Sequence, residues 1–258
     1  MMKPETTEPT LLILTAVAAE SDQLVRVLKQ PQTVQCGHLS VHLGLIGSQR
    51  LAIACCGIGK TSAAAAATLL LNQLPVKHVL MIGCAGAYPE GGLTIGDLAI
   101  ASEEIMGDEG VVTPTGFLDM EQIGFAVVQC GAQHFYNRFP TTTSTCQQLN
   151  SLLSPYAQQH SLQCKVGRFV TISTCSGTAQ YGQQIYQRTQ GIVENMEGAA
   201  VAQVCAQYQT PFSEVRAISN MVEDRNMARW QIKGAMERAQ HAALHVIHCF
   251  AAEKEEPS

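Results

Sequence analysis

Short apolar runs alternate along the chain with segments whose apolar residues recur at helical spacing. Continuous apolar runs are typical of buried strands, whereas recurrence at i, i+3, i+4 and i+7 is typical of helices. The predicted strands cover 11–16, 38–46, 51–56, 79–82, 96–101, 164–173 and 212–218, and the predicted helices cover 21–29, 63–74, 144–159, 179–188, 197–208 and 231–250. No Pro- or Ser-rich linker interrupts this alternation. It therefore predicts one α/β sandwich built on a central sheet.

The domain boundaries follow from the same pattern. Residues 1–10 are expected to be a flexible N-terminus, residues 11–252 a single domain, and residues 253–258 a flexible tail. The polar, glycine-bearing segment 106–125 breaks the periodicity between a predicted strand and a predicted helix. We expect this segment to be an active-site loop.

Composition excludes several classes of protein. Charged residues make up only 14% of the chain, the net charge is -5 and no basic run occurs, which argues against a nucleic-acid partner. The apolar run 11–19 is too short to cross a bilayer, and no signal peptide precedes it, so a soluble protein is expected. Ten cysteines without a C-x-x-C motif indicate reduced thiols and a cytoplasmic location.

The turn at 57–61 (G-I-G-K-T) follows a predicted strand and precedes a helix. It is one residue short of a P-loop, because Ala54 stands where that motif needs glycine. No later strand is predicted to end in the Asp that would hold magnesium, since the run 79–82 ends in Gly83. A tight turn that lets the helix pack on the sheet is the favoured interpretation, and an ATPase is the alternative.

Three polar residues stand where predicted elements meet. Glu20 follows the first strand, Glu197 opens a helix, and Asn220 ends the last strand. The carboxyl edge of the sheet is where α/β proteins place ligands. A Glu at a helix start can also be a capping residue, so the pattern alone leaves both interpretations open.

Several segments resemble, in the same order along the chain, motifs of the 5'-methylthioadenosine/S-adenosylhomocysteine nucleosidases. They are 13–20 (I-L-T-A-V-A-A-E), 57–60 (G-I-G-K), 83–86 (G-C-A-G) and 216–219 (R-A-I-S), and 195–200 (N-M-E-G-A-A) is similar to the ribose clamp of the purine nucleoside phosphorylase/nucleosidase superfamily. The resemblance implies a three-layer α/β/α sandwich with a central mixed, twisted sheet. It also implies a nucleoside substrate, no cofactor or metal, and a homodimer or higher homo-oligomer.

The departures from that family point to a particular substrate. The adenine-cleaving nucleosidases carry Asp after R-A-I-S, where this chain has Asn220. An Asn amide offers a donor and an acceptor but no acid, which suits a 6-oxopurine such as hypoxanthine rather than adenine. The loop 107–111 (G-D-E-G-V), with 116–118 and 123–125, resembles the futalosine hydrolases, which release hypoxanthine from futalosine in a pathway leading to menaquinone.

The resemblance implies a role for each candidate residue. Glu20 would activate water, Asn220 would stabilise the departing base, and Glu197 would bind the sugar hydroxyls. The other residues that it places against the substrate are Met196, Cys84, Ala85, Gly86, Thr174, Asp108, Glu109 and Phe125.

The sequence alone leaves alternatives for several residue roles and for the function. The residue that stacks on the purine is Phe125 or Tyr181, and the proton for the base comes from Asp224 or from water. The cation for the substrate carboxylate is Arg225, Arg229 or Arg138. The alternative functions are a methylthioadenosine, S-adenosylhomocysteine or inosine nucleosidase and, in another class, a nucleoside-binding protein without activity.

Overall fold

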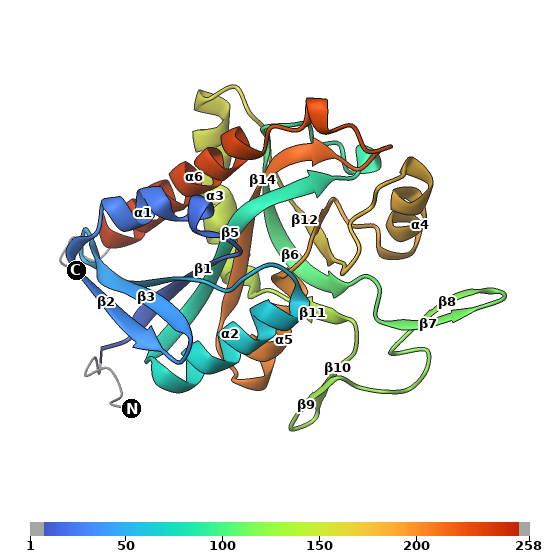
Figure 1. Cartoon of the computed structure of the whole chain (residues 1–258), viewed down its shortest axis with the longest axis horizontal. Helices are drawn as coiled ribbons and strands as arrows, with labels where there is room; N and C mark the ends of the chain where they lie inside the picture. The colour runs from blue at the N-terminus through green and yellow to red at the C-terminus, as the bar shows by residue number, and fades with distance from the viewer. Residues whose placement is uncertain (1–7, 253–258) are drawn as a thin grey trace.

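A ten-stranded mixed sheet runs through the centre of the molecule (Figure 1). The computed structural model describes residues 8–252. The strands of this sheet are β1 (Thr10–Thr15), β2 (Lys29–Cys36), β3 (Leu39–Ile46), β4 (Gln49–Cys55), β5 (Val76–Ala87), β6 (Leu98–Met106), β11 (Arg138–Pro140), β12 (Cys164–Thr171), β13 (Val193–Asn195) and β14 (Phe212–Met221). Their order is β11-β6-β12-β13-β5-β1-β4-β3-β2, and β14 pairs with both β5 and β6.

Helices cover both faces of the sheet. The helices are α1 (Asp22–Arg26), α2 (Lys60–Gln73), α3 (Thr143–Gln159), α4 (Ala179–Thr189), α5 (Gly198–Gln207) and α6 (Ile232–Ala252), with short 3₁₀ turns η1 (Ala18–Glu20), η2 (Pro89–Gly91) and η3 (Met227–Arg229). Successive side chains of β1 point to opposite faces. Leu12 and Leu14 therefore pack with α2 and α5, whereas Leu11 and Ile13 pack with α3 and α6. The predicted three-layer α/β/α sandwich is confirmed.

Five strands of the sheet close into a ring. β14 runs parallel to β5 and antiparallel to β6, while β6 pairs with β12, β12 with β13, and β13 with β5. Small and branched side chains such as Ala85, Ala99 and Val193 fill its interior together with Phe169. This closure fixes the carboxyl ends of β5 and β14 beside the start of α5, where the candidate residues lie.

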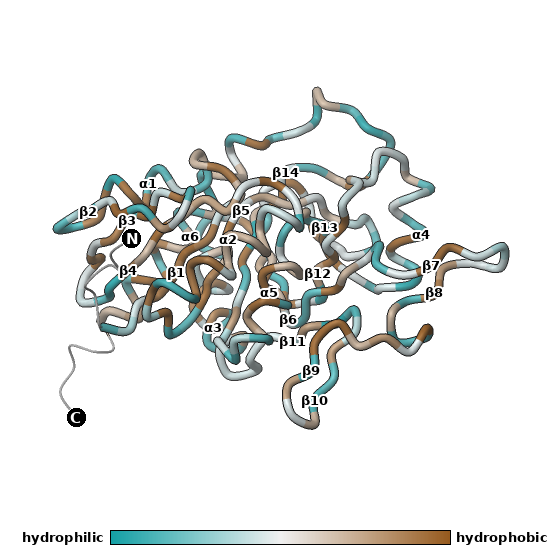
Figure 2. The backbone as a smooth tube through the Cα atoms, turned by 60° about the horizontal axis from the view of Figure 1, so that its bottom comes forward, coloured by the Kyte–Doolittle hydropathy of each residue, from teal (hydrophilic) through white to brown (hydrophobic). Residues whose placement is uncertain are grey.

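Several predicted elements differ from the structure. The strand expected at 79–82 is the twelve-residue β5, and the strand expected at 96–101 is β6, which continues to Met106. The helix expected at 21–29 ends at Arg26, because β2 already begins at Lys29. The segment 106–125, expected to be a loop, forms the hairpin β7 (Gly110–Thr113) and β8 (Gly116–Asp119). A second hairpin, β9 (Val128–Cys130) and β10 (Gln133–Phe135), follows, and both extend away from the body (Figure 2).

The helices and strands of the described residues extend from Thr10, where β1 begins, to Ala252, where α6 ends. The single domain at 11–252 stays a prediction. The predicted tail at 253–258 and most of the predicted flexible N-terminus lie outside the described residues. Within residues 8–252, no helix has the length and apolar character needed to cross a membrane.

Candidate active site

A cavity of about 300 Å³ lies where β1, β5 and β14 end and α5 begins. Its lining combines buried carboxylates, an arginine and two amides with apolar side chains. Its lining residues are Ala16, Val17, Glu20, Ile58, Cys84, Ala85, Gly86, Cys175, Ser176, Glu194, Asn195, Met196, Glu197, Arg216, Ser219, Asn220, Trp230, Ile232 and Met236. Seven of the residues predicted from the sequence are among them: Glu20, Cys84, Ala85, Gly86, Met196, Glu197 and Asn220.

Glu20 is held at the end of β1 by backbone donors. Its Oε2 accepts from the N–H of Ala16 at 3.0 Å and of Val17 at 3.4 Å, and its Oε1 accepts from the N–H of Cys84 at 3.0 Å. The residue is only 2% exposed. These three bonds fix the orientation of the carboxylate against the cavity. Burial and the adjacent Glu20 raise the pKa of the Cys84 thiol to about 12, so this side chain stays a neutral thiol.

Glu197 is the second buried carboxylate of the cavity and occupies the N-cap position of α5, where its side chain makes no capping hydrogen bond. Its Oε1 accepts from the backbone N–H of Gly59 at 3.0 Å, and its Oε2 lies 3.5 Å from Arg216 Nη2. Burial raises the pKa of Glu197, while the charge of Arg216 and the Gly59 bond oppose that shift. The Gly57–Thr61 turn therefore donates a hydrogen bond to a protein carboxylate. Gly59, which supplies the N–H, thus has a role other than the binding of a triphosphate.

Arg216 lies between the two carboxylates. It is 1% exposed, its Nη1 donates to the carbonyl of Cys84 at 3.1 Å, and its Nε donates to Glu214 Oε1 at 2.6 Å. Burial lowers the pKa of Arg216, but the charges of Glu214, Glu197 and Glu20 outweigh that effect and leave it raised. The R-A-I-S motif contains this residue, but no role for it followed from the motif, because its partners Cys84 and Glu197 lie far from it in the sequence.

A Cβ at position 83 would lie 2.6 Å from Glu20 Oε1 and 2.7 Å from Arg216 Nη1. Glycine at this position therefore lets the carboxylate and the guanidinium approach one another across β5. Such a close approach is the ordinary reason for a glycine inside a strand.

Asn220 reaches the cavity from the end of β14. Its Oδ1 accepts from Ser219 Oγ at 2.8 Å, and its Nδ2 donates to the carbonyl of Met221 at 3.1 Å. An amide has two N–H bonds and two oxygen lone pairs, so one donor and one acceptor remain for a ligand.

Glu194, which the sequence reading overlooked, lies beside Asn220, since a Cβ on Gly86 would contact both side chains. Glu194 Oε1 accepts from the N–H of Ser176 at 3.0 Å, and its Oε2 accepts from Ser176 Oγ at 2.7 Å and from Tyr88 Oη at 3.1 Å. Burial raises the pKa of Glu194, and the bonds from Ser176 and Tyr88 oppose this shift. The signal in the sequence was the pair Glu194 and Asn195 directly after the apolar residues Ile192 and Val193.

Four predicted substrate residues do not line the cavity. Asp108 and Glu109 pair with Lys60 Nζ at 2.7 and 2.9 Å, and Asp108 Oδ2 also accepts from the N–H of Ser173. Burial lowers the pKa of Lys60, but bonds to the two carboxylates outweigh it and leave the pKa raised. Thr174 is exposed, and Phe125 on the segment before β9 is 67% exposed.

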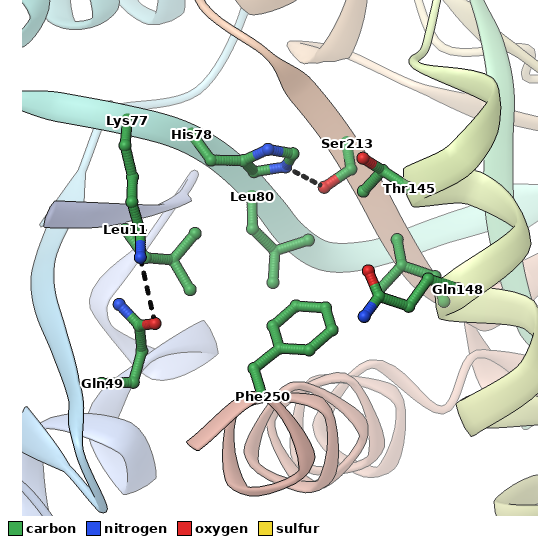
Figure 3. Close-up of a pocket in the computed structure, with 10 residues that line it drawn as sticks. Leu11, Gln49, Lys77, His78, Leu80, Thr145, Gln148, Ser213 and Phe250 are labelled. Carbon is green, nitrogen blue, oxygen red and sulfur yellow. Dashed lines mark hydrogen bonds between the residues drawn. The ribbon is translucent and has the colours of Figure 1, made fainter. Parts of the chain in front are cut away.

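A second cavity, of about 400 Å³, lies at the opposite edge of the sheet, near the amino ends of β1, β5 and β14 (Figure 3). His78 contacts Ser213 at 2.7 Å, and burial and the charge of Lys77 lower the pKa of His78 to about 4. No carboxylate is among the described residues that line it. The pairing of acids, arginine and amide therefore makes the first cavity the candidate active site.

No group of three or more His, Cys, Asp or Glu side chains within residues 8–252 is arranged to hold a metal ion. His241 and His248 are exposed, and the ring centre of His245 lies 4.9 Å from that of Tyr156.

Comparison with known proteins gives relatives of two kinds. A futalosine hydrolase of Thermus thermophilus is 30% identical over 74% of this chain and 78% of its own length. A 5'-methylthioadenosine/S-adenosylhomocysteine nucleosidase of Maridesulfovibrio salexigens is 30% identical over 91% of this chain and 95% of its own. Both are nucleosidases, in agreement with the enzyme class predicted from the sequence.

Solved structures show the same fold. A nucleosidase of the second kind from Neisseria meningitidis, in complex with methylthio-immucillin-A, has a TM-score of 0.80 at 22% identity and covers 94% of this chain and 100% of its own. A futalosine hydrolase mutant of Helicobacter pylori has a TM-score of 0.76 at 19% identity, covering 93% and 99%. The model of the phosphorylase superfamily matches residues 10–251. The chain belongs to the phosphorylase superfamily.

Proposed function

We propose that this nucleosidase hydrolyses the N-ribosidic bond of futalosine and releases hypoxanthine. The observation that carries the proposal is the amide of Asn220 beside the carboxyl group of Glu194 at the cavity. The 30% identity to the Thermus thermophilus futalosine hydrolase supports it. The reaction would use no metal or organic cofactor, in the cytoplasm and in the formation of menaquinone, with the chain as a homodimer or higher homo-oligomer.

The sugar would lie between the two carboxylates. Glu197 accepts hydrogen bonds from the 2'- and 3'-hydroxyls, and these bonds strengthen as positive charge develops on the ribose. Glu20 takes a proton from the attacking water on the face of the sugar opposite the base. Arg216, between them, keeps both carboxylates in place. Met196, Cys84, Ala85 and Gly86 shape the walls around the sugar and base.

Asn220 and Glu194 would recognise the base through hydrogen bonds. Hypoxanthine presents O6 as an acceptor and N1–H as a donor, whereas adenine presents an amino group and an unprotonated N1. The free N–H of Asn220 suits O6, its free lone pair suits a protonated N7, and an oxygen of Glu194 suits N1–H. Asp224 is exposed and accepts from the N–H of Ala179, so water is the better source of the proton for the leaving base.

The tail on the 5' side of futalosine carries a carboxyaryl group. The apolar residues that line the cavity include Ile58, Trp230, Ile232 and Met236. The guanidinium of Arg225 lies 4.5 Å from the centre of the Trp230 ring, and its charge also reaches Cys175 in the cavity wall. Among the three candidate arginines it is the one beside the cavity, because Arg229 pairs with Glu223 and Arg138 with Glu103.

Replacing Asn220 with Asp should redirect specificity. A carboxyl group can donate a proton to N7 of adenine, but as a carboxylate it repels O6 of hypoxanthine. We expect Asn220→Asp to lower kcat/KM for futalosine by about 100-fold, the loss of one well-placed buried donor. The same variant should raise kcat/KM for methylthioadenosine. A variant that cleaves both nucleosides as the wild type does would show that Asn220 does not contact the base.

Replacing Arg225 with Met should raise KM for futalosine about 10-fold, because an apolar chain of similar length keeps the packing on Trp230 and removes only the cation. Cleavage of inosine, which lacks the carboxylate, should be unchanged. Arg229→Met is the matched control, since Arg229 pairs with Glu223 and is 58% exposed. An equal rise of KM for inosine would contradict a carboxylate contact at Arg225.

The experiment that tests the proposal is chromatography of the base released from futalosine, inosine and methylthioadenosine in separate reactions without phosphate. Hypoxanthine from futalosine, with little base from the other two, is the expected result. Adenine from methylthioadenosine would favour the alternative nucleosidase, and tight hypoxanthine binding without turnover would favour a binding protein. A requirement for added phosphate would indicate phosphorolysis.

A further inference from the structure

Two fully buried carboxyl groups face each other beneath the start of α5, outside the substrate cavity. Glu104 on β6 and Glu214 on β14 are both 0% exposed. Glu104 Oε1 and Glu214 Oε2 each lie 2.3 Å from the position that a Cβ on Gly198 would occupy, and the two side chains are within hydrogen-bonding reach. Two carboxylates this close and away from water cannot both be ionised, so the pair holds a proton.

The hydrogen bonds show which carboxyl group is ionised. Glu214 Oε1 accepts from Arg216 Nε at 2.6 Å, a charge-assisted bond that requires a carboxylate. Within residues 8–252 no donor is placed to bond Glu214 Oε2. A proton on Glu104 Oε1 supplies that missing donor. Burial, followed by the charge of Glu214, raises the pKa of Glu104 well above its usual range.

We propose that Glu104 is a neutral carboxylic acid that positions Glu197, through its hydrogen bond to Glu214 and through its bonds to Thr171 and Asn195. The proposal rests on the role of Glu197 given above, whichever nucleoside is the substrate. Glu104 does not line the cavity and touches no substrate. It acts through other residues along two paths, both of which end at Glu197.

The first path is the cap of α5. Glu104 Oε2 accepts from Thr171 Oγ1 at 2.8 Å, and its Oε1 accepts from Asn195 Nδ2 at 3.1 Å. Asn195 Oδ1 in turn accepts from the N–H of Glu197 at 2.9 Å and of Gly198 at 2.8 Å, while Thr171 Oγ1 accepts from the N–H of Ala199 at 2.7 Å. Glu104 thereby anchors the two side chains that satisfy the first N–H groups of this helix.

The second path is electrostatic and runs from Glu214 through Arg216 to Glu197. The proton of Glu104 satisfies Glu214 Oε2 and leaves Glu214 a single negative charge, which holds Arg216. Arg216 then reaches Glu197 Oε2 at 3.5 Å. A second ionised carboxylate at Glu104 would draw Arg216 away from Glu197 and towards the pair. Because Glu104 is neutral, Arg216 remains paired with Glu197 at the active site.

Two matched variants make the same chemical change at the two facing groups. In Glu104→Gln the amide N–H₂ can still donate to Glu214 Oε2 and the amide oxygen can still accept from Thr171 Oγ1. Only the bond from Asn195 Nδ2 is lost, so kcat should stay within about 3-fold of the wild type. In Glu214→Gln the partner charge of Arg216 is lost, so kcat should fall about 10- to 100-fold. Glu104→Leu, which cannot donate or accept, should lose a similar amount, and the contrast with Gln shows rescue by the conservative change.

The pH dependence of unfolding adds a measurement that does not use turnover. The charged groups that act on Glu104 are Glu214 and Arg216 on β14, whereas Thr171 on β12 and Asn195 on β13 are uncharged partners. Because the folded pKa of Glu104 is raised, the folded state retains a proton that the unfolded state loses above pH 4.5, the usual value for this group. Wild-type stability should therefore fall as pH rises above that value, and Glu104→Gln should flatten this fall.

Infrared spectroscopy detects the proton directly. The wild type at neutral pH should show the C=O stretch of a protonated carboxylic acid that is missing from Glu104→Gln. The proposal is overturned if Glu104→Gln loses as much activity as Glu214→Gln, or if the C=O band is the same in the wild type and Glu104→Gln. If the wild type cleaves only an adenine nucleoside, the proposed substrate fails while these comparisons, made with that nucleoside, still decide the role of Glu104.

Discussion

Glu20→Gln should lower kcat by about 10²–10⁴-fold, the usual contribution of a general base, and should leave the binding of the free base unchanged. The amide has nearly the same shape, and its oxygen can still accept backbone hydrogen bonds such as that from Cys84. It cannot take a proton from water. Rapid-quench assays of base release, together with calorimetric titration of hypoxanthine, measure the two quantities separately.

Glu90→Gln is the matched control for this prediction, because Glu90 is exposed on η2 and contacts no part of the cavity lining. It should behave as the wild type does. If Glu20→Gln retained most of the wild-type turnover, water activation would have to come from another group. If hypoxanthine binding were lost as well, the variant would have disturbed the cavity, and Glu20→Asp would be the next comparison.

Glu197→Gln should lower kcat about 10²–10³-fold, which is the effect of removing one preorganised electrostatic contact from a buried site. The carboxylate charge stabilises the sugar only as positive charge develops on it, so kcat should fall more than KM rises. The contact should also be specific to the sugar hydroxyls. Steady-state kinetics with inosine and 2'-deoxyinosine tests this, provided that the wild type cleaves inosine at a measurable rate.

A double-mutant cycle between the enzyme and the substrate completes that test. Removing the 2'-hydroxyl should reduce kcat/KM strongly in the wild type and much less in Glu197→Gln, because the contact is already weakened there. If both enzymes lost activity by the same factor on removal of the hydroxyl, Glu197 would not bind it. The role of its side chain would then be confined to the hydrogen bond from Gly59 and the ion pair with Arg216.

Apolar periodicity was enough to predict an α/β sandwich on a central sheet, and the family resemblance implied its three layers, but the lengths of all elements could not be predicted. The run at 79–82 appeared to end at Gly83, because glycine usually interrupts a strand. In the structure β5 continues to Ala87, and the glycine accommodates Glu20 and Arg216 instead. The ring closed by β14 could not be predicted, because it depends on pairing between β14 and β6, which are far apart in the sequence.

The candidate site was predictable where motifs lie at strand ends and hidden where distant strands meet. Glu20, Glu197 and Asn220 come together at one cavity, as their positions suggested. Glu194 and Arg216 were missed because their partners come from separate parts of the chain: Ser176 and Tyr88 for Glu194, and Cys84 and Glu197 for Arg216. The pairing of Asp108 and Glu109 with Lys60 was also hidden, since it joins the start of a hairpin to α2.

The central claim is that this enzyme prefers a 6-oxopurine nucleoside with a carboxyaryl tail. A single competition reaction tests it most directly: equal concentrations of futalosine and methylthioadenosine, limiting enzyme, and chromatography of both bases at early times. The ratio of hypoxanthine to adenine equals the ratio of the two kcat/KM values. We expect the wild type to release a large excess of hypoxanthine over adenine. An excess of adenine would contradict it and identify the chain as an adenine-releasing nucleosidase.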